Sequence, residues 1–182
     1  MTGRLIAIVG PSGVGKDSVM RGLAEAMPNL KLVKRTITRA PGLDGEDYDA
    51  VQQAEFDRLT DAGAFCLHWQ AHGLSYGIPE ETRARVQRGE EVLVNLSRSV
   101  LAQVREVFPS LIILNMTARP ETLRHRLRQR GREGEVEISQ RLARADNPLP
   151  LAANAVDLSN DGPLEGTIEK AISILYPQKV CT

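Results

Sequence analysis

Aromatic residues, cysteines and net charge are all scarce in this sequence of 182 residues, and each shortage excludes a class of protein. Lys and Arg number 23, as do Asp and Glu, so the net charge is zero, and general attraction to nucleic acid or membrane is not expected. Cys66 and Cys181 are the only cysteines, which predicts a reducing compartment without a disulfide framework. No apolar run approaches the roughly 18–20 residues that span a bilayer.

Residues 5–9 already form an apolar run that predicts a strand. This leaves no room for a signal peptide, and we expect a cytoplasmic protein. There is no internal repeat and no low-complexity tract. The length predicts one domain over residues 1–182 with a full hydrophobic core.

Strand signals alternate with helix signals along the chain. Strands are predicted at 5–9, 30–34, 64–71, 91–96, 111–116 and 156–158, and helices at 16–27, 53–61, 80–88, 98–107, 121–130, 136–145 and 164–175. Residues 36–50 are rich in Gly, Pro and polar side chains and predict an exposed loop, and residues 73–79 predict a turn. The alternation predicts an α/β fold with a mostly parallel sheet and helices on both faces.

A glycine-rich turn links the first predicted strand to the first predicted helix. It consists of Gly10, Pro11, Ser12, Gly13, Val14, Gly15, Lys16, Asp17 and Ser18. Backbone N–H groups and the helix dipole at such a turn bind phosphate, and Lys16 adds a full positive charge. The alternative is a tight turn without a ligand. The strand before the turn and the helix after it favour a nucleoside triphosphate site, with ATP as the expected ligand.

Asp17 departs from the usual motif, which has Ser or Thr at this position to bind Mg²⁺. A carboxylate is also a good hard-oxygen ligand for Mg²⁺. The predicted strand at 91–96, where many such folds keep a metal-supporting acid, has Asn95 near its end instead. We therefore predict that Asp17 holds Mg²⁺. The alternative is a first-turn acid that stabilises the helix by about 0.3–1 kcal/mol.

Further motifs extend along nearly the whole chain. They are TITRAP at 36–41, GEDY at 45–48, EF at 55–56, GAF at 63–65, Trp69, HG at 72–73, YG at 76–77, RLRQRG at 126–131, RL at 141–142 and ND at 160–161. Together with the glycine-rich turn they resemble the guanylate kinase-like nucleoside monophosphate kinases. The resemblance implies a three-layer P-loop NTPase fold with an acceptor-binding insert at about 35–90 and a lid at about 126–142. It also implies transfer of the ATP γ-phosphoryl group to a phosphate oxygen.

The positions with which guanylate kinases read guanine have changed. Arg35 stands in place of a serine, Leu67 or His68 in place of a glutamate, and Ile78 in place of Ser or Thr. A site without these hydrogen-bonding partners discriminates guanine poorly. The resemblance therefore implies an acceptor that carries a phosphate but no nucleobase.

The residues that the family uses for the acceptor phosphate are largely kept, namely Arg39, Tyr48 and Tyr76, whereas Gly42 replaces a second arginine. GKDS at 15–18, WQAHGL at 69–74, YGIP at 76–79 and VNLSR at 94–98 resemble the ribose 1,5-bisphosphate phosphokinases of phosphonate catabolism. These enzymes make 5-phosphoribosyl 1-diphosphate from ATP and ribose 1,5-bisphosphate. A sugar with two phosphates needs more cations, which Arg35, Arg39 and Arg98 offer.

Two other functions stay open. One is a nucleoside monophosphate kinase, guanylate kinase included. The other is a non-catalytic guanylate kinase-like interaction module, although such modules commonly lose the phosphate loop that this sequence retains. Either alternative would change the partner, which we otherwise expect to be a small phosphorylated sugar rather than nucleic acid or a membrane.

Seven arginines lie between positions 124 and 144. Arg124 and Arg128 fit a solvated helix face with glutamate partners. The resemblance places Arg130 and Arg141 in the lid, where they would contact the transferred phosphate. A nucleic-acid patch is disfavoured by the balanced charge and by the lack of stacking aromatics.

Single residues complete the candidate site. His72 lies in the acceptor-side stretch and either contacts the sugar or has a structural role. Asn160 matches the family's nucleotide-base edge, or together with Asp161 it caps the following helix. The aromatic residues Phe56, Phe65 and Trp69 are predicted to be core rather than ligand contacts, because large aromatic side chains normally supply buried area.

Overall fold

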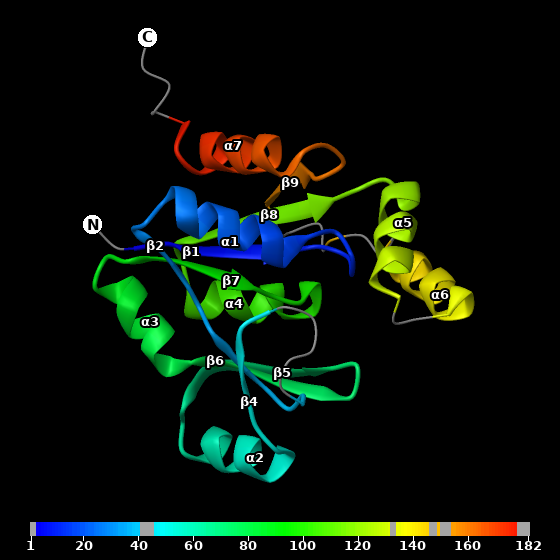
Figure 1. The fold of residues 1–182 in the computed structure, drawn as a ribbon. Coiled ribbons are helices and arrows are strands. Elements are labelled where there is room, and N and C mark those ends of the chain that lie inside the picture. Colours follow the sequence, from blue (N-terminus) through cyan, green and yellow to red (C-terminus); the bar gives the residue numbers. More distant parts are fainter. Residues whose placement is uncertain (1–2, 41–45, 132–133, 146–148, 150–153, 178–182) are drawn as a thin grey trace. The chain divides into compact units, whose positions relative to one another are not determined.

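Strands and helices alternate along the chain as predicted, and they form an α/β fold with two sheets (Figure 1). The computed structural model describes residues 3–40, 46–131, 134–145, 149 and 154–177, without the side chains of residues 130, 141, 144 and 145. The elements are β1 (Leu5–Val9), α1 (Lys16–Ala26), β2 (Leu30–Leu32), β3 (Arg35–Ile37), β4 (Tyr48–Ala50), α2 (Gln53–Asp61), β5 (Phe65–Ala71), β6 (Leu74–Pro79), α3 (Glu80–Gln87), β7 (Glu91–Asn95), a 3-10 turn (Arg98–Val100), α4 (Leu101–Val107), β8 (Leu111–Thr117), α5 (Pro120–Arg130), α6 (Glu135–Ala145), β9 (Ala155–Ser159) and α7 (Leu164–Leu175).

The larger sheet has the strand order β2-β7-β1-β8-β9. β2 pairs parallel with β7, and β8 pairs parallel with β9. Every residue of β1 is buried, which is why its sequence is apolar throughout rather than alternating. The prediction of a mostly parallel central sheet is confirmed.

The chain divides into two compact units, one of residues 1–6, 28–94 and 99–112, the other of residues 7–27, 95–98 and 113–182. The first contains the insert predicted at about 35–90, and the second contains the lid predicted at about 126–142. The organisation as one kinase domain with these two parts stays a prediction.

The first unit holds a smaller sheet with the order β4-β3-β6-β5. Its presence corrects two predictions. Residues 36–50 are not all loop, because 35–37 and 48–50 form β3 and β4, strands too short to give a periodic signal. Residues 74–79 form β6, and the turn is confined to His72 and Gly73, which both have positive φ. Such a two-residue turn suits the twist of a hairpin.

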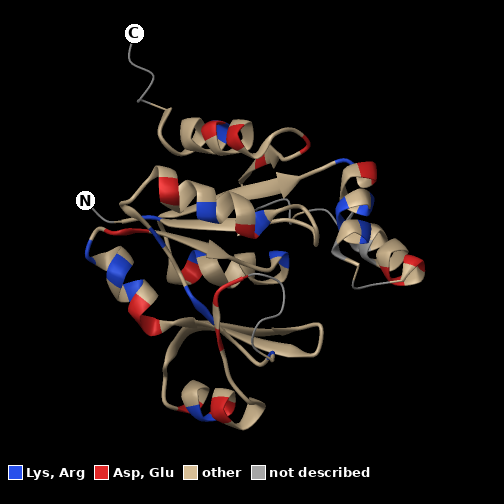
Figure 2. Cartoon of the chain, in the orientation of Figure 1, with Lys and Arg blue, Asp and Glu red and all other residues tan. Residues whose placement is uncertain are grey.

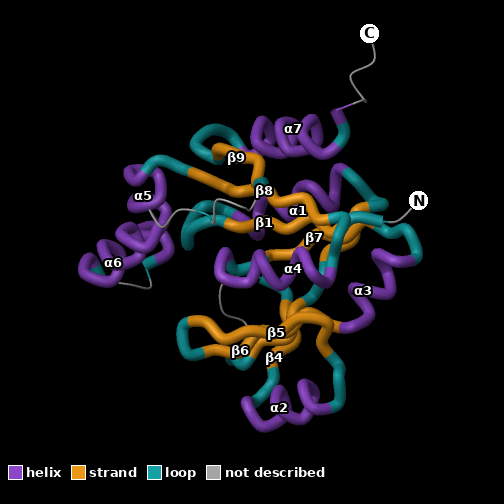
Figure 3. Tube along the Cα trace, turned by 180° about the vertical axis from the view of Figure 1, so that it is seen from behind, coloured by secondary structure: helices purple, strands orange, loops and turns teal. Residues whose placement is uncertain are grey.

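Helix α2 lies against one face of this smaller sheet in both views (Figures 1 and 3). Phe56 of α2 stacks on Phe65 of β5 with ring centroids 4.9 Å apart, and Ser75 Oγ donates to Gln53 Oε1 at 3.0 Å. A Cβ at Gly77 would lie 2.6 Å from the Phe65 ring. Glycine at this point of β6 therefore makes room for the aromatic pair. Phe56 is buried, as predicted for a core aromatic.

In the second unit, α1 and α7 pack side by side (Figure 1). A Cβ at Gly22 of α1 would overlap the Ile168 side chain of α7, so the small residue allows the two helices to approach closely. α7 has the bounds predicted for it. In the part of the chain that the structure describes, every helix is too short or too polar to cross a bilayer.

Cys66 is a free thiol in β5. Its Sγ donates to the carbonyl oxygens of Ile78 and Pro79 at 3.5 and 3.4 Å. Burial raises the pKa of this thiol to about 11, so it stays protonated and unreactive at neutral pH. The second cysteine, Cys181, lies outside the described residues.

Replacing Gly77 by Ala should destabilise the protein by about 1–3 kcal/mol, because the added methyl group overlaps the Phe65 ring. The measurement is the free energy of unfolding in urea. Gly166 of α7 has nothing within 4 Å of an added Cβ, so Gly166→Ala is the matched control and should stabilise by up to about 1 kcal/mol. Equal midpoints for Gly77→Ala and the wild type would contradict the packing described here.

Candidate functional site

The loop between β1 and α1 depends on glycine for both backbone conformation and space. Gly10 and Gly15 have φ of 152° and 95°. A Cβ at Gly10 would lie 2.6 Å from the Met116 carbonyl oxygen, and one at Gly15 would lie 2.7 Å from Asn160 Nδ2. At Gly10 and Gly15, the Met116 carbonyl oxygen and the Asn160 amide therefore leave no room for a side chain.

Helix α1 begins directly at this loop, with Gly15 as its N-cap and with no side-chain hydrogen bond to cap it. The first N–H groups of a helix have no intrahelical partner, and the helix dipole gives this end partial positive charge. Lys16 Nζ donates to the carbonyl oxygens of Gly10 and Pro11 at 3.0 and 3.1 Å, which keeps its charge at the loop. The arrangement suits a phosphate group.

Asp17 lies in the first turn of α1 and is half-buried. Among the residues that the structure describes, no three His, Cys, Asp or Glu side chains gather into a metal cage. Mg²⁺ at nucleotide sites is usually bound by one or two carboxylates together with substrate phosphates, and Asp17 beside a phosphate loop fits that chemistry. The helix-acid alternative fits the same position, so the metal role stays a prediction.

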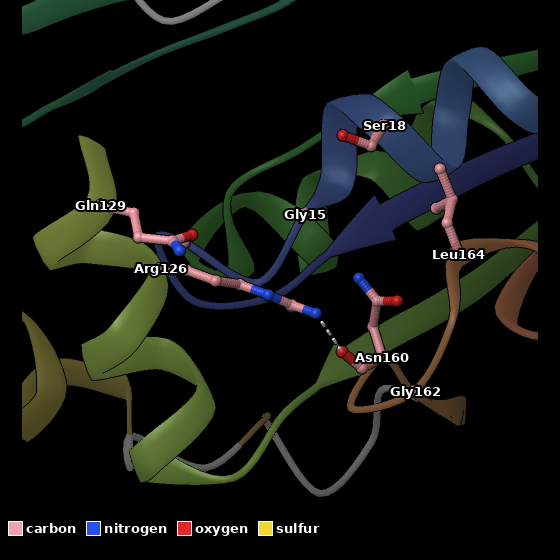
Figure 4. A pocket seen from close by; sticks show the side chains of 8 residues that line it. Gly15, Ser18, Arg126, Gln129, Asn160, Gly162 and Leu164 are labelled. Atoms are coloured by element: carbon pink, nitrogen blue, oxygen red, sulfur yellow. Dashed lines mark hydrogen bonds between the residues drawn. The ribbon is translucent and has the colours of Figure 1, made fainter.

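A pocket of about 340 Å³ opens beside the loop (Figure 4). It is lined by Gly13, Gly15, Ser18, Arg126, Gln129, Asn160, Gly162 and Leu164. Four of these, Gly13, Gly15, Ser18 and Asn160, were predicted for nucleotide binding. The pocket therefore joins the predicted phosphate loop to the predicted base edge within one compact unit.

Asn160 is 4% exposed, and hydrogen bonds of its side chain and its backbone N–H hold it in place. Its Nδ2 donates to the Val14 carbonyl oxygen at 2.8 Å, its Oδ1 accepts from Thr167 Oγ1 at 2.9 Å, and its backbone N–H donates to the Thr117 carbonyl oxygen at 2.8 Å. The cap alternative is wrong, because α7 begins after Pro163 and has no side-chain cap. Asn160 instead ties the loop after β9 to the phosphate loop.

Asp161 stabilises the same turn. Its Oδ1 accepts from the Arg119 backbone N–H at 2.9 Å, and its Oδ2 accepts from Ser159 Oγ at 3.1 Å. The hydrogen bond from Arg119 is the main cause that lowers the pKa of this carboxyl group. Asp161 is therefore ionised at neutral pH, and it holds the chain beside Asn160 in place.

Arg126 of α5 belongs to the site although its role was not predicted from the sequence. Its Nη1 donates to the Val14 carbonyl oxygen at 3.2 Å and its Nη2 to the Asn160 carbonyl oxygen at 2.8 Å (Figure 4). Helical spacing alone does not single it out, because Arg126 follows the buried Leu123 by three residues and Arg124 precedes the buried Leu127 by three, so both arginines flank the buried face of α5.

Arg124 and Arg128 lie on the solvated face of α5, as predicted. Arg128 makes a bidentate pair with Glu135 of α6, with Nε–Oε1 and Nη2–Oε2 distances of 2.6 and 2.8 Å. The pair raises the pKa of Arg128, and Figure 2 shows cationic α5 beside acidic residues of α6. Arg124 is exposed as well. The side chains of Arg130 and Arg141 lie outside the described residues, so their phosphate role stays a prediction.

The predicted acceptor residues lie in the first unit. Arg39 Cζ is 5.8 Å from the ring centroid of Tyr48, and the Tyr48 hydroxyl donates to the Ala40 carbonyl oxygen at 2.5 Å. Tyr48 thereby supports the chain that carries Arg39. His72 occupies the exposed tip of the β5–β6 hairpin, and its contact with a sugar stays a prediction.

Two positions that differ from guanylate kinases are closed to ligands. Leu67 and Ile78 face each other across β5 and β6 and are 6% and 1% exposed. Neither offers a hydrogen-bonding side-chain group. His68, the alternative to Leu67 at the position of the glutamate, is polar and exposed on the same strand. Arg98 after β7 is half-buried, and burial lowers the pKa of its guanidinium group.

This chain is similar to known kinases over nearly its whole length. The family model described as guanylate kinase matches residues 2–175. Ribose 1,5-bisphosphate phosphokinase PhnN of Ruegeria sp. (strain TM1040) is 49% identical over 178 residues, which is 97% of this chain and 94% of the relative. The protein of the same name from Pseudomonas paraeruginosa (strain DSM 24068 / PA7) is 43% identical over 184 residues and the full length of both.

Solved structures show the same fold. The guanylate kinase of Anaplasma phagocytophilum aligns with a TM-score of 0.72 at 22% identity, over 100% of this chain and 88% of its own. A gluconokinase from Sinorhizobium meliloti 1021 aligns with a TM-score of 0.56 at 20% identity, over 98% of both chains. At these identities the likeness concerns the fold alone.

Replacing Arg126 by Ala should weaken ATP binding roughly tenfold or more, because hydrogen bonds from a charged donor contribute about 1.5–3 kcal/mol each. The measurement is titration calorimetry with a non-hydrolysable ATP analogue. Arg128→Ala on the same helix is the matched control and should change the affinity less than about twofold, since exposed ion pairs contribute little. Equal losses in both variants would contradict a specific role of Arg126.

Proposed function

We propose, because this chain belongs to the guanylate kinase family, that it transfers the γ-phosphoryl group of ATP to the 1-phosphate of ribose 1,5-bisphosphate. The product would be 5-phosphoribosyl 1-diphosphate. The observation that carries the proposal is the 49% identity to a ribose 1,5-bisphosphate phosphokinase over 97% of this chain. The buried, apolar Ile78 supports it, because the resemblance implies that a guanine-reading site has Ser or Thr there.

The second unit would bind ATP. The uncapped start of α1 and Lys16 suit the triphosphate, and the pocket lined by Arg126 and Asn160 offers room for the nucleoside. Arg126 and Asn160 both bond to the Val14 carbonyl oxygen, so the wall of the pocket and the phosphate loop form one connected structure. Such preorganisation lowers the cost of ordering the site on binding.

The chemistry would require little proton transfer. An oxygen of the acceptor 1-phosphate is already anionic and attacks the γ-phosphorus, the bond to the β–γ bridging oxygen breaks, and ADP leaves. Catalysis then rests on positioning and on neutralising the charge of the transferring group. We assign this role to Lys16, Arg39, Arg130 and Arg141.

The first unit would bind the acceptor. Arg39, supported on the Tyr48 ring, is the proposed phosphate-binding cation, and Tyr48, Tyr76 and His72 complete the proposed acceptor site. Arg35, paired with Glu46, would shape this site rather than add a phosphate-binding charge. Arginine suits this task because its planar fork matches the oxygens of a phosphate.

We also propose that the reaction depends on Mg²⁺ held by Asp17 together with the nucleotide phosphates. Bound Mg²⁺ would neutralise charge on the phosphate oxygens. The carboxylate beside Lys16 supports this assignment, since a cation close by offsets its charge. A cytoplasmic location and a small phosphorylated sugar as partner belong to the same proposal.

The proposed activity predicts that the protein with ATP and Mg²⁺ converts ribose 1,5-bisphosphate far faster than GMP. Phosphorus NMR would detect the new diphosphate, and ADP release measured side by side gives kcat/KM for both acceptors. Comparable kcat/KM values would favour a nucleoside monophosphate kinase. Failure to bind ATP and Mg²⁺ at all would favour a non-catalytic interaction module.

Replacing Asp17 by Asn should raise the Mg²⁺ concentration for half-maximal rate on the order of tenfold, which corresponds to about 1.4 kcal/mol of lost binding free energy. The measurement is the rate as a function of free Mg²⁺ at saturating ATP. Glu25→Gln in the last turn of α1 is the control and should leave the Mg²⁺ dependence unchanged. A lower melting temperature without a changed Mg²⁺ dependence would support the helix-acid alternative instead.

A further inference from the structure

Arg35 and Glu46 form a buried bidentate ion pair in the first unit. Arg35 Nε and Nη2 donate to Glu46 Oε1 and Oε2 at 2.7 and 2.6 Å, and the two side chains are 8% and 15% exposed. Removing two charges from water is costly, so such a pair seldom adds stability in comparison with apolar residues. Its geometry does fix the plane of the guanidinium group, because both donors and both acceptors are used.

The guanidinium group of Arg35 lies over an aromatic ring. Its Cζ is 5.2 Å from the ring centroid of Tyr76, and Tyr76 in turn stacks on Trp69 with centroids 5.2 Å apart and an angle of 8° between the planes. The strand order β3-β6-β5 puts Tyr76 on the strand between those of Arg35 and Trp69. Trp69 and Tyr76 are directly opposite each other in the β5–β6 ladder.

In this stack the rings of Tyr76 and Trp69 are already in contact with each other and with Arg35. Bases bind proteins by stacking on aromatic faces, and the contact tolerates any base because each has a π-face. Tyr76 and Trp69 are both buried, with one ring against the other and with Arg35 over Tyr76. A sugar phosphate has no π-face and loses nothing when these rings are covered.

Glu46 also cancels the charge that Arg35 would bring to the acceptor site. With both carboxylate oxygens bonded to Arg35, the pair is neutral as a whole, and Arg39 beside Tyr48 is a separate cation. The primary effect of the Arg35–Glu46 pair is then steric and orientational rather than an increase in phosphate affinity.

We infer that Glu46 is a positioning residue that determines acceptor specificity, because it holds Arg35 over Tyr76 and so excludes acceptors that carry a nucleobase. This inference rests on the proposed phosphorylation of ribose 1,5-bisphosphate and adds the means of rejecting nucleoside monophosphates. Nothing in the inference requires Glu46 to touch the substrate.

The test compares Glu46→Gln with the wild type. The amide keeps the shape but loses the charge, so Arg35 leaves the Tyr76 ring. The ratio of kcat/KM for GMP to that for ribose 1,5-bisphosphate should rise roughly tenfold, within the range expected for stacking one base. Glu55→Gln is the matched control, since Glu55 makes an exposed bidentate pair with Arg58 at 2.8 and 2.7 Å and should not change the ratio.

A second readout does not depend on catalysis. Trp69 is the only tryptophan in the sequence, so protein fluorescence excited at the indole reports on the stack directly. Glu46→Gln should shift the Trp69 emission to longer wavelength and increase quenching by acrylamide, whereas Glu55→Gln should do neither. Calorimetric titration with GMP alone should show tighter binding to Glu46→Gln than to the wild type.

The outcomes separate the two proposals. Absence of activity on ribose 1,5-bisphosphate in the wild type would refute the proposed function, whereas fluorescence and GMP binding would still test Glu46. A shifted Trp69 emission without gain in GMP binding or in the kcat/KM ratio would overturn the inference, and so would unchanged fluorescence in a folded variant. If Glu46→Gln does not fold, the double variant Arg35→Gln with Glu46→Gln leaves no buried charge unpaired and must show the same gain in GMP binding.

Discussion

The hydrogen bonds to the Val14 carbonyl oxygen are the constraint on which the candidate nucleotide site depends. Asn160 and Arg126 both donate to this one atom, and they come from segments far apart in the sequence. A phosphate loop needs its backbone N–H groups to converge before the ligand arrives. The shared acceptor therefore fixes the loop, the turn after β9 and helix α5 as one arrangement.

Close packing around the phosphate loop also explains why Gly15 cannot be replaced by a larger residue. Asn160 approaches Gly15 so closely that a methyl group would overlap its amide, and that closeness is what allows the bond to Val14. Packing in the second unit and phosphate binding therefore depend on the same residues. A substitution that alters the packing around Gly15 also alters the loop that would bind phosphate.

Much of this organisation could be predicted from the sequence. The phosphate loop was predictable because strand, glycines, lysine and helix are contiguous, and local chemistry determines the conformation. β3 and β4 were missed because three-residue strands carry too little periodicity, and only pairing partners distant in sequence reveal them. Arg126 and Glu46 were missed for a related reason. Arg126 bonds to Val14 and Asn160, and Glu46 bonds to Arg35. Only the tertiary fold brings these partners together, so their contacts are not visible in the sequence.

The buried pair of Arg35 and Glu46 also limits how such a protein can change. Losing either partner alone leaves an uncompensated buried charge, which typically costs about 3–5 kcal/mol and is a large share of the stability of a small domain. Losing both together avoids that cost. Glu46 belongs to the GEDY motif that resembles guanylate kinases, whereas Arg35 stands in place of their serine. The order of substitution therefore matters, because an arginine gained at position 35 finds its carboxylate already present, whereas loss of Glu46 first would strand a buried cation.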